Sequence, residues 1–176
     1  MLECGYIHVY TGNGKGKTTA ALGLLLRAVG AGLRPCLIQF LKAGESSDVA
    51  VLRERLPEVT IYQWGHEGRL LLGRAPERID YEAARGGLDQ CRQLMATGHY
   101  DLIILDEINV ALALGLLEEE EILDLMAHKP EQVELVLTGR YATRAIMQAA
   151  DVVTDMACTK HYYLDRGIPA RKGIEW

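Results

Sequence analysis

The sequence predicts a three-layer α/β fold, in which a mostly parallel central sheet is covered by helices on both faces. Three observations lead to this prediction. Short apolar runs alternate with longer helical patterns along the whole chain, as in parallel sheets with crossover helices. A glycine-rich loop joins the first apolar run to the first helical pattern. An Asp-Glu pair follows directly after a continuous apolar run at 102–105.

The first elements lie close together along the chain. Residues 6–10 predict a strand, and residues 20–28 predict a helix that ends at the glycines of 30–32. A second strand is expected at 36–40. The run Ser46-Ser47-Asp48 is suited to begin a helix, which Pro57 ends.

The middle of the chain combines a short strand with a long loop. Residues 59–62 predict the third strand, and 63–78 read as a loop because they hold three glycines and a proline. Loops of this length in compact domains are usually functional or mobile. A helix is expected at about 77–95, weakened by Gly86 and Gly87.

The last third repeats the alternation of strands and helices. The apolar run 102–105 predicts a buried parallel strand. Further strands are expected at 134–138 and 151–155, with helices at 118–127 and 143–149. Ligands of such sheets bind at the carboxyl ends of the strands, so the loops at that edge are the candidate site.

The glycine-rich loop, Gly12-Asn-Gly-Lys-Gly-Lys-Thr-Thr19, has the strand–loop–helix context of a P-loop. Its glycines let backbone N–H groups converge on phosphate oxygens, and the following helix N-terminus adds donors. Lys17 is placed to reach phosphate, and the Thr18 hydroxyl to bind Mg²⁺. The loop departs from the standard pattern because Thr11 replaces the first glycine and Lys15 adds a second cation. We therefore predict a P-loop NTPase-like (RecA-like) fold over a single domain, residues 1–176.

The pair Asp106-Glu107 resembles the Walker B acids of P-loop proteins, which hold Mg²⁺ directly or through water. Two further cations follow predicted strands at the same edge. Arg140 reaches phosphate or ribose, or else it is a surface turn residue, and the sequence supports both interpretations. Lys42 either contacts phosphate or is solvated. The basic segment 160–173 is either a solvated tail or a flap over an anionic ligand.

The composition limits the function. The 176 residues carry a net charge of −5, which disfavours a nucleic-acid binder. The four cysteines are widely spaced, which favours free thiols in a reducing cytoplasm. Neither a signal peptide nor a membrane span is expected. No nucleophile–base pair has a recognisable signature, as expected for a reaction driven by positioning and electrostatics.

These segments, together with Gln39–Lys42, Leu105–Asn109, Thr138–Arg140 and Gly167–Glu175, occur in the order seen in one enzyme family. The chain resembles the P-loop ATP:corrinoid adenosyltransferases over nearly its whole length, and the unusual P-loop is itself a trait of that family. The resemblance implies that reduced cob(I)alamin, or a related corrinoid, attacks the 5′ carbon of ATP and that tripolyphosphate leaves.

The resemblance also implies roles for individual residues. The ATP-binding set is Thr11, Gly12, Asn13, Gly14, Lys15, Gly16, Lys17, Thr18, Thr19, Lys42, Asn109 and Arg140. Lys15, Lys17 and Glu107 are the expected catalytic residues, and Thr18, Asp106 and Glu107 the expected Mg²⁺ ligands. A homodimer is expected, and an electron-donating reductase is a candidate partner. Some members carry a Phe-x-Trp pair after the third strand, where this chain has Trp64 alone. Trp64 and the leucines 70–72 either contact the corrinoid or, in the case of Trp64, pack into the core.

Two other functions fit a P-loop domain. One is an ATPase or small-molecule kinase, in which Glu107 orients a water or hydroxyl and the products are ADP and phosphate. The other is a non-catalytic RecA-like nucleotide-binding module, which the acidic composition disfavours.

Overall fold

The computed structural model describes residues 2–66 and 75–175. Its centre is a six-stranded sheet with the order β3-β2-β4-β5-β1-β6, and every strand pair in it is parallel. This confirms the α/β prediction. The strands are β1 (Ile7–Thr11), β2 (Pro35–Phe40), β3 (Thr60–Trp64), β4 (Leu102–Asp106), β5 (Glu134–Thr138) and β6 (Val152–Asp155).

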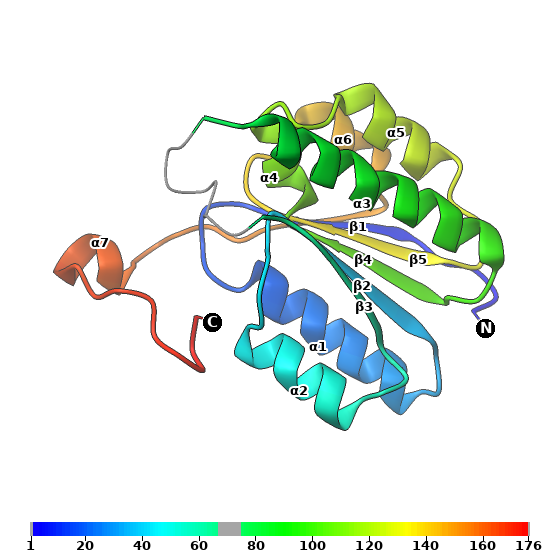
Figure 1. The fold of residues 1–176 in the computed structure, drawn as a ribbon, viewed down its shortest axis with the longest axis horizontal. Helices are drawn as coiled ribbons and strands as arrows, with labels where there is room; N and C mark the ends of the chain where they lie inside the picture. Colours follow the sequence, from blue (N-terminus) through cyan, green and yellow to red (C-terminus); the bar gives the residue numbers. More distant parts are fainter. Residues whose placement is uncertain (1, 67–74, 176) are drawn as a thin grey trace.

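Helices cover both faces of the sheet, and one helix lies apart from it (Figure 1). The first face carries α1 (Lys17–Gly30) and α2 (Ser47–Arg55), and the second carries α3 (Arg78–Thr97), α4 (Ile108–Ala113), α5 (Glu119–Ala127) and α6 (Arg144–Ala149). The short α7 (Tyr162–Arg166) projects beyond the carboxyl edge of the sheet and buries none of its residues. None of the helices among the described residues is long and apolar enough to cross a membrane.

The core follows from the continuous apolar runs of the central strands. Every residue of β2 and β4 is buried, so these strands are apolar on both faces. One apolar cluster lies between the sheet and α1 and α2, and a larger one lies under α3 and α5. Within the described residues, the buried polar side chains of the strands lie near the carboxyl edge of the sheet, at Thr11, Gln39, Asp106 and Thr138.

The glycine pair in α3 lets this helix approach the sheet closely. A Cβ on Gly86 would lie 2.4 Å from the ring of Trp64, and one on Gly87 would lie 2.8 Å from the ring of Phe40. The pair predicted to weaken the helix therefore makes room for two aromatic rings. Burying these rings offsets the lower helix propensity of glycine.

Three details differ from the sequence-based expectations. Gln63 and Trp64 belong to β3, so the long loop begins after Trp64, and part of it (67–74) lies outside the described residues. The helix α4 was not predicted, because Ile108–Ala113 is almost wholly apolar and shows no amphipathic period. The basic tail contains α7, which has only five residues and is too short to reveal a pattern.

A candidate nucleotide and metal site at the carboxyl edge of the sheet

The loop between β1 and α1 folds as a P-loop, and the side chain of its Lys17 points back toward the backbone of the loop. Lys17 is buried, and its Nζ donates to the carbonyl oxygens of Gly12 and Gly14, each at 2.7 Å. Burial lowers the pKa of Lys17, and the nearby charge of Arg140 lowers it further. Lys17 and Arg140 thus repel each other across the pocket, and an anion between them would relieve that repulsion.

The loop's glycines are required by a chain segment that runs beside it. Gly12 has a φ of 93°, and a Cβ there would lie 2.1 Å from the carboxylate of Asp155. A Cβ on Gly14 would lie 2.5 Å from the carbonyl oxygen of Met156, which accepts a hydrogen bond from the Gly14 N–H at 2.6 Å. The segment after β6 therefore fixes the shape of this loop, and Thr11 takes the place of the usual first glycine.

Asp106 is completely buried at the end of β4 and accepts four side-chain hydrogen bonds. Thr18 and Thr138 each donate to Oδ1 at 2.8 Å. Lys42 Nζ lies 2.6 Å from Oδ2, and Gln39 donates to the same oxygen at 3.1 Å. Burial alone would raise the pKa of Asp106, but the charge and hydrogen bond of Lys42 and the threonine hydroxyls outweigh it and lower the pKa. Asp106 is therefore held as a carboxylate.

Glu107 is the N-cap residue of α4 and has a left-handed backbone conformation, with a φ of 65°. Its N–H donates to Thr138 Oγ1 at 3.0 Å, which links this turn to the Asp106 network. Burial raises the pKa of Glu107, and the neighbouring Asp106 charge adds to the effect. A non-glycine residue held at positive φ beside a cavity, with a raised carboxyl pKa, is typical of functional sites.

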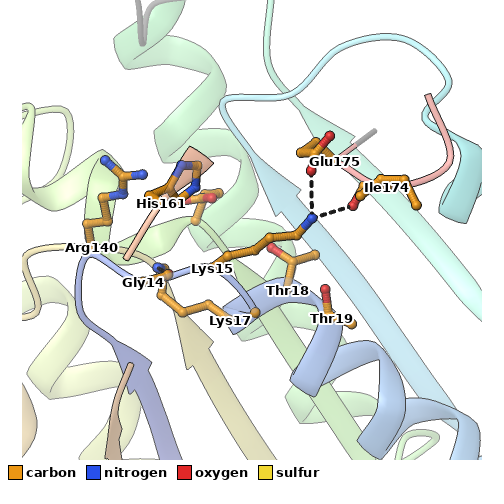
Figure 2. Close-up of a pocket in the computed structure, with 11 residues that line it drawn as sticks. Gly14, Lys15, Lys17, Thr18, Thr19, Arg140, His161, Ile174 and Glu175 are labelled. Atoms are coloured by element: carbon orange, nitrogen blue, oxygen red, sulfur yellow. Dashed lines mark hydrogen bonds and ion pairs between the residues drawn. The ribbon is translucent and has the colours of Figure 1, made fainter. Parts of the chain in front are cut away.

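The C-terminal segment folds back onto the P-loop at Lys15. Lys15 Nζ donates to the carboxylate of Glu175 at 2.8 Å and to the carbonyl oxygen of Ile174 at 2.9 Å (Figure 2). It also donates to the hydroxyl of Tyr162 at 3.4 Å. The sequence left open whether the basic tail is solvated or covers the site, and the structure shows features of both. The tail is mostly exposed, yet its end reaches the P-loop.

These groups surround a polar pocket of about 290 Å³. Figure 2 shows Lys17, Thr18 and Thr19 along one side of it, and Arg140 and His161 on the other. Its volume is close to the lower limit for a small-molecule site. The lining residues are Gly14, Lys15, Gly16, Lys17, Thr18, Thr19, Glu107, Arg140, His161, Ile174 and Glu175.

Eight of the fourteen residues predicted for the site line this pocket, and six do not. Thr11 and Asn109 are buried behind it, and Asn109 donates to the carbonyl oxygen of Gly139 at 3.4 Å. Asn13 is exposed, and Gly12 faces the segment after β6. Lys42 pairs with the fully buried Asp106, and neither residue lines the pocket.

Three lining residues were not among the predicted ones: His161, Ile174 and Glu175. The C-terminal sequence contains them, but no spacing rule indicates that a tail some 160 residues downstream returns to the P-loop. A contact of this kind depends on tertiary structure. The available signals were the basic composition of the tail and the resemblance of Gly167–Glu175 to the family.

Trp64 packs against the larger apolar cluster and is partly buried beneath α3. This position favours the core interpretation over a corrinoid contact. Its indole Nε1 is buried and has no hydrogen-bond partner among residues 2–66 and 75–175. Leu70, Leu71 and Leu72 lie outside the described residues.

The donors at the site suit Mg²⁺ bound together with a nucleotide. The Thr18 hydroxyl and the Asp106 and Glu107 carboxylates are hard oxygen ligands. No group of three or more His, Cys, Asp or Glu side chains within 2–66 and 75–175 is arranged to hold a metal alone. A site with so few protein ligands requires phosphate oxygens and water to complete it, which is how Mg²⁺ is usually held.

Comparisons with known proteins agree with this geometry. Residues 3–176 match the family model described as ATP:corrinoid adenosyltransferase BtuR/CobO/CobP. The chain is 36% identical to a corrinoid adenosyltransferase of Pseudomonas aeruginosa, over 99% of this chain and 85% of that protein. It is 32% identical to one from Escherichia coli K12 and 31% identical to one called CobA from Salmonella typhimurium, in each case over 99% of this chain and 87% of the relative.

Proposed function

The chain belongs to the ATP:corrinoid adenosyltransferase family, and from this membership we propose how its P-loop site carries out the reaction. Its activity is the transfer of the adenosyl group of ATP to a corrinoid. In the proposed step, the electron pair of the reduced cobalt forms a bond to the 5′ carbon of ATP. The bond from that carbon to the triphosphate oxygen breaks, and its electrons leave with tripolyphosphate.

The observation that carries this proposal is the cationic P-loop pocket. The negative charge on the triphosphate grows as the bond to carbon breaks, so fixed cations near it stabilise the transition state. Lys15, Lys17 and Arg140 line the pocket, and the last two repel each other without an anion. The reaction as proposed needs no side chain to remove a proton, which is consistent with the lack of a nucleophile–base pair in the sequence.

Thr18, Asp106 and Glu107 are the residues that we propose to hold Mg²⁺. The metal would supply further positive charge to the leaving triphosphate. Asp106 is already ionised, and the raised pKa of Glu107 is the effect that a nearby cation reverses. The hydrogen bonds from Gln39, Lys42 and Thr138 orient the Asp106 carboxylate.

Residues 1–176 form one domain in this proposal, and the protein acts in the cytoplasm as a homodimer, with a reductase as a candidate electron donor. The four cysteines are free, in keeping with a reducing compartment. The exposed edge strand β6 carries Val152 and Val153 and offers a surface for a second copy. Light scattering after size-exclusion chromatography measures the oligomeric state.

The test of the function is direct. Protein is mixed with ATP, Mg²⁺ and chemically reduced cobalamin, and the light-sensitive adenosylcobalamin spectrum should appear. Omitting ATP gives the control. If cobalamin stays unmodified while other reduced corrinoids also fail to react, the proposal is wrong.

A further inference from the structure

The carboxylate of Glu175 lies where several donors converge. Besides Lys15, the backbone N–H of Arg171 donates to it at 2.6 Å, and the Arg171 guanidinium donates at 3.3 and 3.4 Å. The hydroxyl of Tyr162 donates to the same carboxylate. Arg171 also stacks on the ring of Tyr162, 4.9 Å from its centroid. The Lys15 hydrogen bond, followed by those of Tyr162 and Arg171, lowers the pKa of Glu175 well below its usual range.

This cluster has the chemistry of a phosphate site. Lysine, the planar guanidinium of arginine and a tyrosine hydroxyl bind phosphoryl oxygens as readily as carboxylate oxygens. The cluster shares Lys15 and Glu175 with the P-loop pocket. A terminal phosphoryl group carries more charge and more oxygens than one carboxylate, so it competes well for the same donors.

The C-terminal segment is attached to the body of the protein in a way that permits this exchange. Within the described part of the chain, the hydrogen bonds that link residues 160–175 to the rest all come from Lys15. The helix α7 buries no residue. Gly167 and Gly173 have positive φ angles at the two ends of the segment that returns to the P-loop. Ion pairs between partly exposed groups are weak, so the contact opens readily.

We propose that Lys15, Tyr162 and Arg171 form a subsite for the terminal phosphoryl group of ATP or of released tripolyphosphate, and that Glu175 fills this subsite until the phosphate displaces it. The proposal rests on the ATP-dependent reaction proposed above. Glu175 is then a built-in competitor, whose return to Lys15 favours release of the phosphate product.

The test compares variants of the full chain by titration calorimetry with inorganic tripolyphosphate, ATP and adenosine at a fixed Mg²⁺ concentration. Glu175→Gln keeps the shape and removes the competing charge, so phosphate-bearing ligands should bind roughly two- to five-fold more tightly. Arg171→Ala should weaken the same ligands by at least about two-fold. Adenosine, which lacks phosphate, should be unaffected. Asp165→Asn removes an acid from the same segment without touching Lys15 and is the matched control for net charge.

The ligands distinguish the two sources of phosphate. Tighter binding of both ATP and tripolyphosphate assigns the subsite to substrate and product, and tighter binding of tripolyphosphate alone assigns it to the product. The proposal is overturned if Glu175→Gln binds ATP and tripolyphosphate no more tightly than the parent does. It is also overturned if Arg171→Ala leaves the affinity for both ligands unchanged. Unchanged melting temperatures exclude unfolding as the cause. If the protein fails to adenosylate corrinoids but Glu175→Gln still binds tripolyphosphate more tightly, the proposed reaction is refuted and the proposed subsite is supported.

Discussion

The ion pair between Lys42 and Asp106 is predicted to couple the end of β2 to the buried acid that we propose as an Mg²⁺ ligand. In Asp106→Asn, Lys42 loses the carboxylate 2.6 Å from its Nζ, and Gln39 loses a charged acceptor. Breaking a buried pair costs about 3–5 kcal/mol, and a hydrogen bond to a charged group contributes about 1.5–3 kcal/mol. Because 32% of the Lys42 side chain is exposed, water reduces the loss. We expect the free energy of unfolding to fall by about 2–3 kcal/mol, which lowers Tm by about 5–10 °C.

A double-mutant cycle isolates this interaction. Lys42→Met removes the cation and keeps the stem, and the Asp106→Asn/Lys42→Met protein lacks both charges. The double variant should lose less stability than the two single losses combined, by about 1–2 kcal/mol. The assay is urea unfolding followed by circular dichroism at pH 7, without nucleotide or metal, so that ligand binding does not contribute. Additivity within about 0.5 kcal/mol would refute the coupling.

The pH dependence of stability follows from the same network. The folded pKa of Asp106 is lowered, so its contribution is complete above the unfolded value of about 3.9 and is lost as the pH falls through the folded value. The parent protein should therefore lose stability more steeply below about pH 4 than Asp106→Asn does. If the free energy of unfolding falls with pH equally in the two proteins in this range, the lowered pKa is not that of Asp106.

Four further substitutions test individual roles. Lys17→Ala should slow adenosylation by some hundreds-fold, because a group that stabilises transition-state charge contributes about 3–4 kcal/mol, and near-normal turnover of the folded variant would remove Lys17 from the mechanism. Thr18→Val should need much more Mg²⁺ for activity, whereas an Mg²⁺ titration that overlays the parent's would make Thr18 a helix-start residue only. Glu107→Gln should raise the Tm of the ligand-free protein near pH 7 and lower its activity. The folded pKa of Glu107 is raised, so its ionisation opposes folding above the unfolded pKa, and the glutamine removes that cost. A lowered Tm contradicts this. Trp64→Ala should cost about 3–5 kcal/mol of stability if the ring packs beneath α3, and slower corrinoid kinetics with an unchanged Tm would favour the corrinoid contact instead.

Much of the fold was predictable from local patterns. The apolar runs that became β2 and β4 are continuous because these strands are buried on both faces, and the glycine-rich loop and the Asp-Glu pair mark the carboxyl edge. The missed helix α4 is apolar on every side, so it lacks the period that reveals a surface helix.

The parts of the site that could not be predicted depend on distant segments. Lys42 was a candidate phosphate ligand, yet it pairs with Asp106 because β2 and β4 are neighbours in the sheet. Glu175 meets Lys15 only because the chain turns back after α7. These contacts cannot be predicted from sequence spacing or from local propensity.

The phosphate product distinguishes adenosyl transfer from ATP hydrolysis and from phosphoryl transfer. Protein, ATP, Mg²⁺ and a reduced corrinoid are combined in equal amounts, and the products are followed by phosphorus NMR. We predict one tripolyphosphate for each adenosylated corrinoid, and none when the corrinoid is left out. ADP with inorganic phosphate, formed whether or not the corrinoid is present, would contradict the account and identify an ATPase or kinase.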